Sequence, residues 1–390
     1  MTSWLEVFRV FLRLGATSFG GPIAHLGYFR EEFVSRRRWL DERTYADLVT
    51  LCQFLPGPAS SQVGFAIGLN RAGLRGGLAA WLGFTLPSAV ALALFALLLR
   101  SASVPAVSGW LHGLKIVAVA VVAQAVWSMG KKLCPDAPRA SITVVAAILL
   151  LLVPGAVAQI GVIGLGAIAG AAWLHGDSTA ASRESLSAGI SAKTGAAALL
   201  LFVILLVALP VAVRTGWRSN LALFDAFYRS GALVFGGGHV VLPLLQAEMV
   251  PPGWVTNDAF LAGYGAAQAV PGPLFTFAAY LGALIDGPAG ALVCTVAIFL
   301  PGLLIVAGAL PFWERVRGHP AAQAALSGVN AAVVGLLLAA LYHPVFTSAV
   351  HAPADLGLAL AAFALLVFWK VSPFVVVVAT SLGGAAISFI

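Results

Sequence analysis

The chain contains the same arrangement of residues twice. The segment FRVFLRLGATSFGG at 8–21 matches FDAFYRSGALVFGG at 224–237, with identical residues at matching positions that lie 216 residues apart. After one single-residue gap the match continues through QFLPGP at 53–58 and QAVPGP at 268–273, and after a second such gap through Gly68 and Gly282. So long a match in register indicates an internal duplication rather than shared composition.

Each copy carries two motifs that break helices. A Gly-Gly pair ends the first matching segment, and a Pro-Gly-Pro motif follows about thirty residues later in each copy. Proline removes a backbone donor and clashes with the preceding turn, while glycine permits left-handed dihedral angles. Both copies are therefore predicted to interrupt their helices at the same two points.

The runs around these breaks are apolar and of helical length. The chain is 60% hydrophobic and only 9% charged, with a mean hydropathy of +0.97, whereas a soluble domain carries about 25% charged residues. The runs lack the alternation of a barrel strand, and the first residues have charges and no cleavage site. The sequence predicts an all-α, multi-pass integral membrane protein, inserted directly into a bacterial inner (plasma) membrane.

Charge distribution distinguishes two topologies. The first two apolar blocks of each copy contain the breaks, so each block can form a re-entrant hairpin rather than a span. With hairpins, most Lys and Arg residues fall on one side, which the positive-inside rule assigns to the cytoplasm. This topology has about nine full spans plus about four hairpins, whereas crossings by every block would give up to about 13 spans.

An extra apolar run near 195–213 follows a polar, Ser- and Ala-rich segment at 175–193. Because each copy keeps an even number of spans, this additional span inverts the second copy. The predicted divisions are an N-terminal membrane repeat at 1–174, a linker with an inverting helix at 175–219, and an inverted repeat at 220–390. Inverted repeats with broken helices are typical of secondary transporters.

The breaks also indicate a binding site. Irregular backbone at membrane depth is tolerated only inside protein or beside water, so the hairpin tips are expected to meet. A helix that starts after a break presents free N–H groups and a partial positive charge, which favour an anion. The predicted substrate-binding residues are Gly20, Gly21, Pro22, His25, Gln53, Pro56, Gly57, Pro58, Ser60, Ser61, Lys115, Gly236, Gly237, Gly238, His239, Gln268, Pro271, Gly272, Pro273 and Thr276.

Several of these residues have a structural alternative. The Pro-Gly-Pro motifs can be ordinary turns whose hydroxyl residues cap helices, and His25 and His239 can be packed hydrogen bonders. Lys115, within an apolar run, is predicted to neutralise an anion at mid-depth, although it can also extend to the interface. Ser61 and Thr276 occupy equivalent positions, and both hydroxyls are predicted to contribute to anion binding.

The remaining composition excludes other classes of function. The net charge of +7 is assigned to cytoplasmic loops at a lipid bilayer rather than to nucleic-acid binding. The three cysteines are scattered without metal-ligand spacing. No catalytic residue, metal site or cofactor is predicted, and the motifs of a membrane enzyme are absent from the sequence.

The motifs FGGP, RRRWLDE, QFLPGP, FGGGHVVLP and QAVPGP resemble those of the chromate ion transporter family. The likeness covers essentially the whole chain and is to long bacterial members with two homologous membrane domains. The resemblance implies chromate efflux and chromate resistance, driven by membrane potential or a proton gradient, and a relation to sulfate, which has the same tetrahedral shape. The sequence lacks a nucleotide-binding P-loop, which favours secondary transport, such as antiport.

Two alternatives stay open at this point, an oxyanion channel and a sulfate uptake transporter. The sequence also leaves open the coupling ion and whether the chain forms a homodimer.

Overall fold

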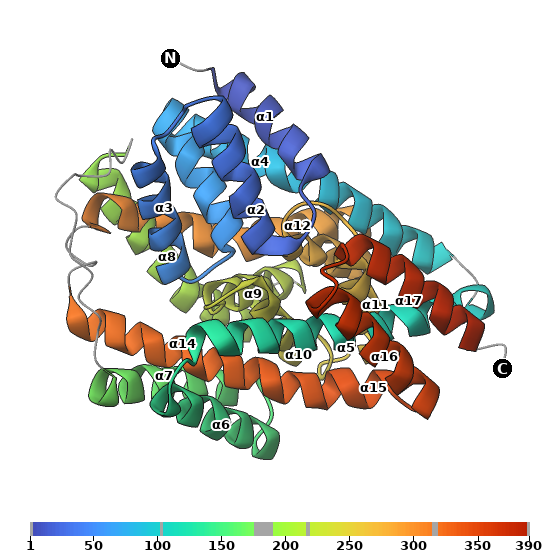
Figure 1. Cartoon of the computed structure of the whole chain (residues 1–390). Helices are drawn as coiled ribbons and strands as arrows, with labels where there is room; N and C mark the ends of the chain where they lie inside the picture. The colour runs from blue at the N-terminus through green and yellow to red at the C-terminus, as the bar shows by residue number, and fades with distance from the viewer. Residues whose placement is uncertain (1–2, 102–103, 175–189, 216–218, 314–318, 388–390) are drawn as a thin grey trace.

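The computed structural model describes residues 3–101, 104–174, 190–215, 219–313 and 319–387 (Figure 1). In the first copy the helices are α1 (Trp4–Thr17), α2 (Gly21–Arg30), the π-helical η1 (Glu31–Arg36), α3 (Glu42–Phe54), α4 (Ala59–Ser101), α5 (Val104–Leu133), α6 (Ala137–Leu152) and α7 (Ala156–Trp173). The connecting helix is α8 (Ala192–Arg214).

The second copy repeats this order. Its helices are α9 (Ser219–Ala232), η2 (Gly238–Val240), α10 (Val241–Met249), α11 (Asn257–Ala267), η3 (Leu274–Thr276), α12 (Phe277–Ala309), η4 (Leu310–Phe312), α14 (Pro320–Ala340), η5 (Leu341–Phe346), α15 (Thr347–Ala349), α16 (Pro353–Val367) and α17 (Pro373–Ile387). No strand occurs in the described part of the chain. Six stretches in the described residues are long and apolar enough to cross a membrane. The predicted all-α membrane fold is confirmed.

The helices break at the predicted motifs. Gaps follow α1, α3, α9 and α11, and a Gly-Gly or Pro-Gly-Pro motif lies in each gap or, for Gly20-Gly21, at its end, where Gly21 begins α2. Six glycines of these motifs have positive φ, the region that other residues avoid. They are Gly20, Gly21, Gly57, Gly236, Gly237 and Gly272. The backbone therefore needs glycine at the positions that the two copies share.

The long helices α4 and α12 each contain a second reversal. Non-helical dihedral angles occur at Ala72-Gly73 in α4 and at Asp286-Gly287 in α12. A Cβ placed on Gly68 would lie 2.3 Å from the Gly76 carbonyl oxygen, so the two arms of α4 run back against each other. The first arm lies against α3, as the predicted hairpin requires, and the second arm, residues 74–101, corresponds to the predicted span.

Helices occur at all nine predicted spans, but several are short. The helices α6, α16 and α17 have 16, 15 and 15 described residues, which gives about 23 Å at 1.5 Å per residue. The hydrocarbon core of a bilayer is about 30 Å thick. The number of full spans therefore stays a prediction. The polar linker at 175–189 lies outside the described residues.

The two copies exchange their last helices. In Figure 1, α14 (orange) packs on α6 and α7 (green), while α5 (teal) packs on α16 and α17 (red). Glycines allow the close approach, because a Cβ on Gly328 would lie 2.0 Å from the Gly166 carbonyl oxygen and a Cβ on Gly384 would lie 2.5 Å from Gly113 Cα. The α4 and α12 helices also pack on each other, so neither copy is an independent unit.

Candidate functional site

The four breaks lie together, joined by two crossed backbone hydrogen bonds. Gly57 N–H donates to the Val234 carbonyl at 2.7 Å, and Gly272 N–H donates to the Ser18 carbonyl at 2.9 Å. Ser18 and Val234 are equivalent positions, 216 residues apart. Each Pro-Gly-Pro motif is thus bonded to the Gly-Gly segment of the other copy. We call residues 18–25, 56–62, 234–239 and 271–276 the break cluster.

Close packing reinforces these crossed bonds. A Cβ on Gly57 would lie 3.0 Å from Gly302 Cα in α12, and one on Gly272 would lie 2.8 Å from Ser88 Oγ in α4. The two Gly-Gly segments also approach each other, since a Cβ on Gly238 would lie 3.7 Å from Pro22 Cγ. The sequence-based expectation that the hairpin tips meet agrees with this arrangement.

His25 connects three parts of the break cluster. Its side chain is buried, with 1% exposed. Nε2 lies 3.2 Å from the Ser18 carbonyl oxygen and Nδ1 lies 3.3 Å from Ser60 Oγ. Because a carbonyl oxygen only accepts, Nε2 carries the proton, and a neutral ring then accepts the Ser60 hydroxyl at Nδ1. His25 therefore holds the start of α4 against the carbonyl that also binds Gly272.

Three buried polar atoms of the break cluster have no hydrogen-bond partner among the described residues. They are Ser18 Oγ, Ser61 Oγ and Gln62 Oε1, on side chains that are at most 1% exposed. The amide nitrogen of Gln62 is engaged, because Nε2 donates to the carbonyls of Pro56 at 2.7 Å and Gly302 at 3.2 Å. Buried polar groups are nearly always paired, so these atoms are suited to bind water or a polar ligand.

The corresponding hydroxyl in the second copy is already paired. Thr276 Oγ1 donates to the Pro273 carbonyl at 2.8 Å. The second copy also resumes its helices through the short 3₁₀ turns η2 and η3. In the first copy, α2 and α4 begin directly after their breaks, with Pro22 in the first turn of α2 and Pro58 immediately before α4. The first copy therefore presents two regular α-helix N-termini, with free N–H groups, directly at its breaks.

His239 and Gln268 meet at one tyrosine. His239 Nδ1 lies 2.7 Å from the Tyr264 hydroxyl, and Gln268 Nε2 donates to the Tyr264 carbonyl at 3.5 Å. Sequence reasoning missed Tyr264 and Ser18. The repeat gave no signal for either of them, because the equivalent residues are Val49 and Val234.

Gln53 and Lys115 are bonded to residues outside the break cluster. Gln53 is exposed and its Oε1 accepts from Lys132 Nζ at 3.5 Å. Lys115 Nζ donates to Asp258 Oδ1 at 3.0 Å. The packing of α11 on α5 thus supplies Lys115 with a carboxylate partner, and its predicted role in neutralising an anion stays a prediction. Asn330, the equivalent of Lys115, lies at the break instead, with Oδ1 3.4 Å from a Cβ placed on Gly236.

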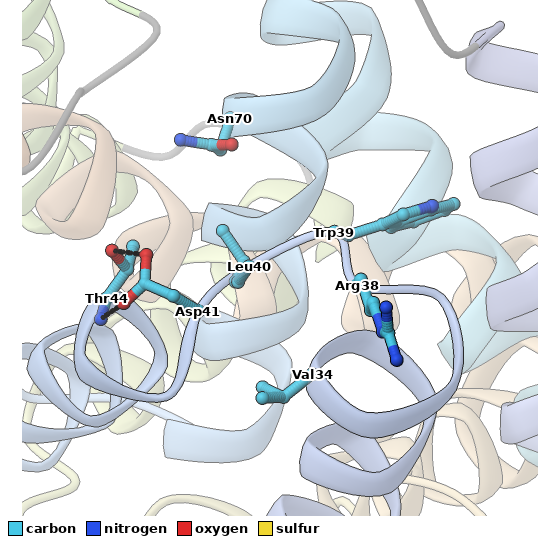
Figure 2. Close-up of a pocket in the computed structure, with 7 residues that line it drawn as sticks. All are labelled: Val34, Arg38, Trp39, Leu40, Asp41, Thr44 and Asn70. Atoms are coloured by element: carbon cyan, nitrogen blue, oxygen red, sulfur yellow. Dashed lines mark hydrogen bonds between the residues drawn. The ribbon is translucent and has the colours of Figure 1, made fainter.

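A separate cavity of about 570 Å³ lies where η1 turns into α3 (Figure 2). It is lined by Val34, Arg38, Trp39, Leu40, Asp41, Thr44 and Asn70. Asp41 caps α3 by accepting hydrogen bonds from Thr44 N at 2.9 Å and Thr44 Oγ1 at 2.7 Å. These bonds hold the pKa of Asp41 below its ordinary value. None of the lining residues belongs to the break cluster.

Comparisons with known proteins agree with the duplicated architecture. The family model described as chromate transporter matches residues 5–171 and again residues 221–387. A chromate transport protein of Pseudomonas aeruginosa is 30% identical over 98% of this chain and 92% of its own length. One from Cupriavidus metallidurans is 28% identical, covering 94% of this chain and 88% of its own length.

A probable chromate transport protein of Synechococcus elongatus is 26% identical over 86% of this chain and 83% of its own length. No solved structure has a significant match to the chain. Two matches to one family model, one in each copy, together account for most of the sequence. The chain belongs to the chromate transporter family.

Proposed function

We propose that the chain is a secondary active transporter that exports chromate from the cytoplasm and binds it at the break cluster. The observation that carries the proposal is the crossed pairing of the four breaks, together with the unpartnered buried hydroxyls of Ser18 and Ser61. The choice of chromate as the substrate is taken from the relatives, which are named chromate transport proteins. The geometry suits it because a tetrahedral dianion needs several donors from different directions.

The donors available to an oxyanion are neutral. They are the first N–H groups of α2 and α4 and the Ser61 hydroxyl, which has no other partner among the described residues. As defined, the break cluster contains no Lys or Arg. Binding by dipoles and hydroxyls, without a fixed cation, offsets part of the desolvation cost of a dianion and leaves the anion free to dissociate on the other side.

The membrane potential favours the proposed direction. Moving one charge through 100 mV changes its free energy by about 2.3 kcal/mol. A dianion that leaves an inside-negative cell therefore gains about 4.6 kcal/mol per 100 mV. Export of the dianion therefore needs no energy source besides the membrane potential. Exchange for a proton that enters the cell would add to this driving force.

Transport into everted vesicles tests the proposal, because their interior corresponds to the outside of the cell. Vesicles that contain the protein should accumulate chromate with saturable kinetics, and sulfate should compete. Vesicles from cells without the protein measure leakage. An uncoupler should abolish accumulation above the external chromate concentration, because it removes the membrane potential and the proton gradient.

Other outcomes contradict specific parts of the proposal. Flux that increases linearly with the chromate concentration, without saturation, would identify a channel. Sulfate accumulation in right-side-out vesicles, with no chromate accumulation in everted ones, would identify an uptake transporter.

A further inference from the structure

The two copies differ in how their second hairpin packs. In the second copy, α11 lies along α5 of the first copy. The equivalent helix of the first copy, α3, makes its main contacts with α4 and α2, and no comparable contact joins it to α14 in the described residues. Two repeats with the same motifs thus adopt two different packing arrangements.

The difference in packing involves equivalent faces of α11 and α3. The α11 positions Asp258, Leu261, Gly265 and Gln268 correspond to Arg43, Ala46, Thr50 and Gln53 in α3. Leu261 and Gly265 are buried, whereas all four α3 residues are exposed. Three of the four exposed residues are polar, which suits a surface that faces water rather than lipid.

Three contacts hold α11 against α5 and α15. Lys115 Nζ lies 3.0 Å from Asp258 Oδ1, and Asn257 Nδ2 donates to Ser348 Oγ in α15 at 2.6 Å. About two turns further along α11, a Cβ on Gly265 would lie 2.2 Å from the Leu114 carbonyl oxygen and 3.2 Å from Val117 Cγ1. The α5–α11 interface is therefore tight, with Val117 fully buried.

Charge assigns the two packing arrangements to opposite sides of the membrane. The segment before α11, residues 251–256, has no Lys or Arg, whereas Arg36, Arg37 and Arg38 precede α3. By the positive-inside rule the closed contact is external and the exposed α3 face is cytoplasmic. Inverted repeats alternate access when each copy adopts the arrangement of the other.

We propose that Lys115 and Asp258 hold an outer gate closed between α5 and α11, and that the structure represents the inward-facing state of the transport cycle. The inference rests on the proposed secondary transport. In the opposite state α11 leaves α5, and the exposed face of α3 closes the cytoplasmic side. Lys115 then controls access to the break cluster without binding the anion.

Paired thiol labelling tests the gate. In a background without the native cysteines, Val117→Cys reports external access in intact cells, and Thr50→Cys reports cytoplasmic access in everted vesicles. An exposed ion pair shifts an equilibrium by about two- to fivefold. Asp258→Asn should therefore increase the labelling rate of Val117→Cys by about two- to fivefold and decrease that of Thr50→Cys. Ser348→Ala should act in the same direction.

The exchanged pair Lys115→Asp with Asp258→Lys should restore both rates, because the attraction is kept. Asp136→Asn is the matched control, since it removes the Arg139 ion pair and keeps a capping side chain on α6. It should change neither rate. Rapid labelling of Val117→Cys in the parent, or an Asp258→Asn variant with unchanged rates, would overturn the gate.

Labelling needs no substrate, so it separates the two proposals. A parent protein that moves no oxyanion while its labelling responds to Asp258→Asn would refute the proposed function and keep the gate. Normal chromate export with unresponsive labelling would refute only the gate.

Discussion

Ser61 and Thr276 occupy equivalent positions after the two Pro-Gly-Pro motifs, yet their hydroxyls have different surroundings. Ser61 Oγ is buried without a partner among the described residues, whereas Thr276 Oγ1 bonds to the Pro273 carbonyl. The sequence predicts the same role for both. The structure favours Ser61 as the ligand and Thr276 as a local cap, so the proposed site is asymmetric.

Ser61→Ala should raise the half-saturating chromate concentration. A hydrogen bond to a charged group contributes about 1.5–3 kcal/mol, which corresponds to about a ten- to hundredfold change. The measurement is initial uptake into everted vesicles over a range of chromate concentrations. Thr276→Val is the matched control and should change this concentration little, because its hydroxyl already has an internal acceptor. Equal effects of the two variants would assign both hydroxyls the same role.

At the scale of elements, helices of different copies approach each other most closely at glycines, which have no Cβ. The helix α7 contains glycines that contact the other copy and glycines that do not. A Cβ on Gly170 would lie 2.4 Å from the Ala324 carbonyl oxygen in α14, whereas Gly164 has no neighbour within 4 Å among the described residues. The contact is with backbone atoms, which cannot move aside as a flexible side chain can. The exchange of helices between copies depends on such positions.

Gly170→Ala should therefore destabilise the protein, while Gly164→Ala should not. Overpacking costs about 1–3 kcal/mol, and alanine is the better helix former at an open position. Thermal unfolding of the detergent-solubilised protein, followed by size-exclusion chromatography, measures the difference. Equal loss of stability in both variants would contradict this explanation, since the α7–α14 contact at Gly170 would then not be the cause of the destabilisation.

At the scale of the whole molecule, the proposed mechanism requires that the two copies enter the membrane from opposite sides. Ser35 in η1 and Pro252 before α11 are both exposed, and each lies at the base of a hairpin in its own copy. Asn257 is less suitable as a probe, because its side chain bonds to Ser348. The two exposed positions report the orientation of the copies directly.

An impermeant thiol reagent should label Pro252→Cys in intact cells and Ser35→Cys only in everted vesicles. The reason is the arginine-rich segment next to Ser35, which the membrane potential retains in the cytoplasm. Labelling of both positions from the same side would exclude the inverted arrangement, and with it the alternation of the two packing arrangements.

Much of this protein could be predicted from sequence alone because the determining features are local. Glycine and proline break a helix wherever they occur in a motif such as Gly20-Gly21 or Pro56-Gly57-Pro58, and hydropathy reports membrane insertion residue by residue. The duplication then assigns equivalent breaks to both copies. The membrane class and the break positions follow from these features, whereas the family follows from the resemblance of the motifs to those of chromate transporters.

Only the tertiary structure determined which groups are paired. Lys115 meets Asp258 across 143 residues of sequence, and Gly57 meets Val234 of the other copy. Such contacts depend on how α5, α11 and the hairpins pack in three dimensions, and neither periodicity nor the repeat reports that packing. For the same reason the repeat predicts equivalent breaks in both copies but not that α11 packs on α5 while the matching face of α3 stays exposed.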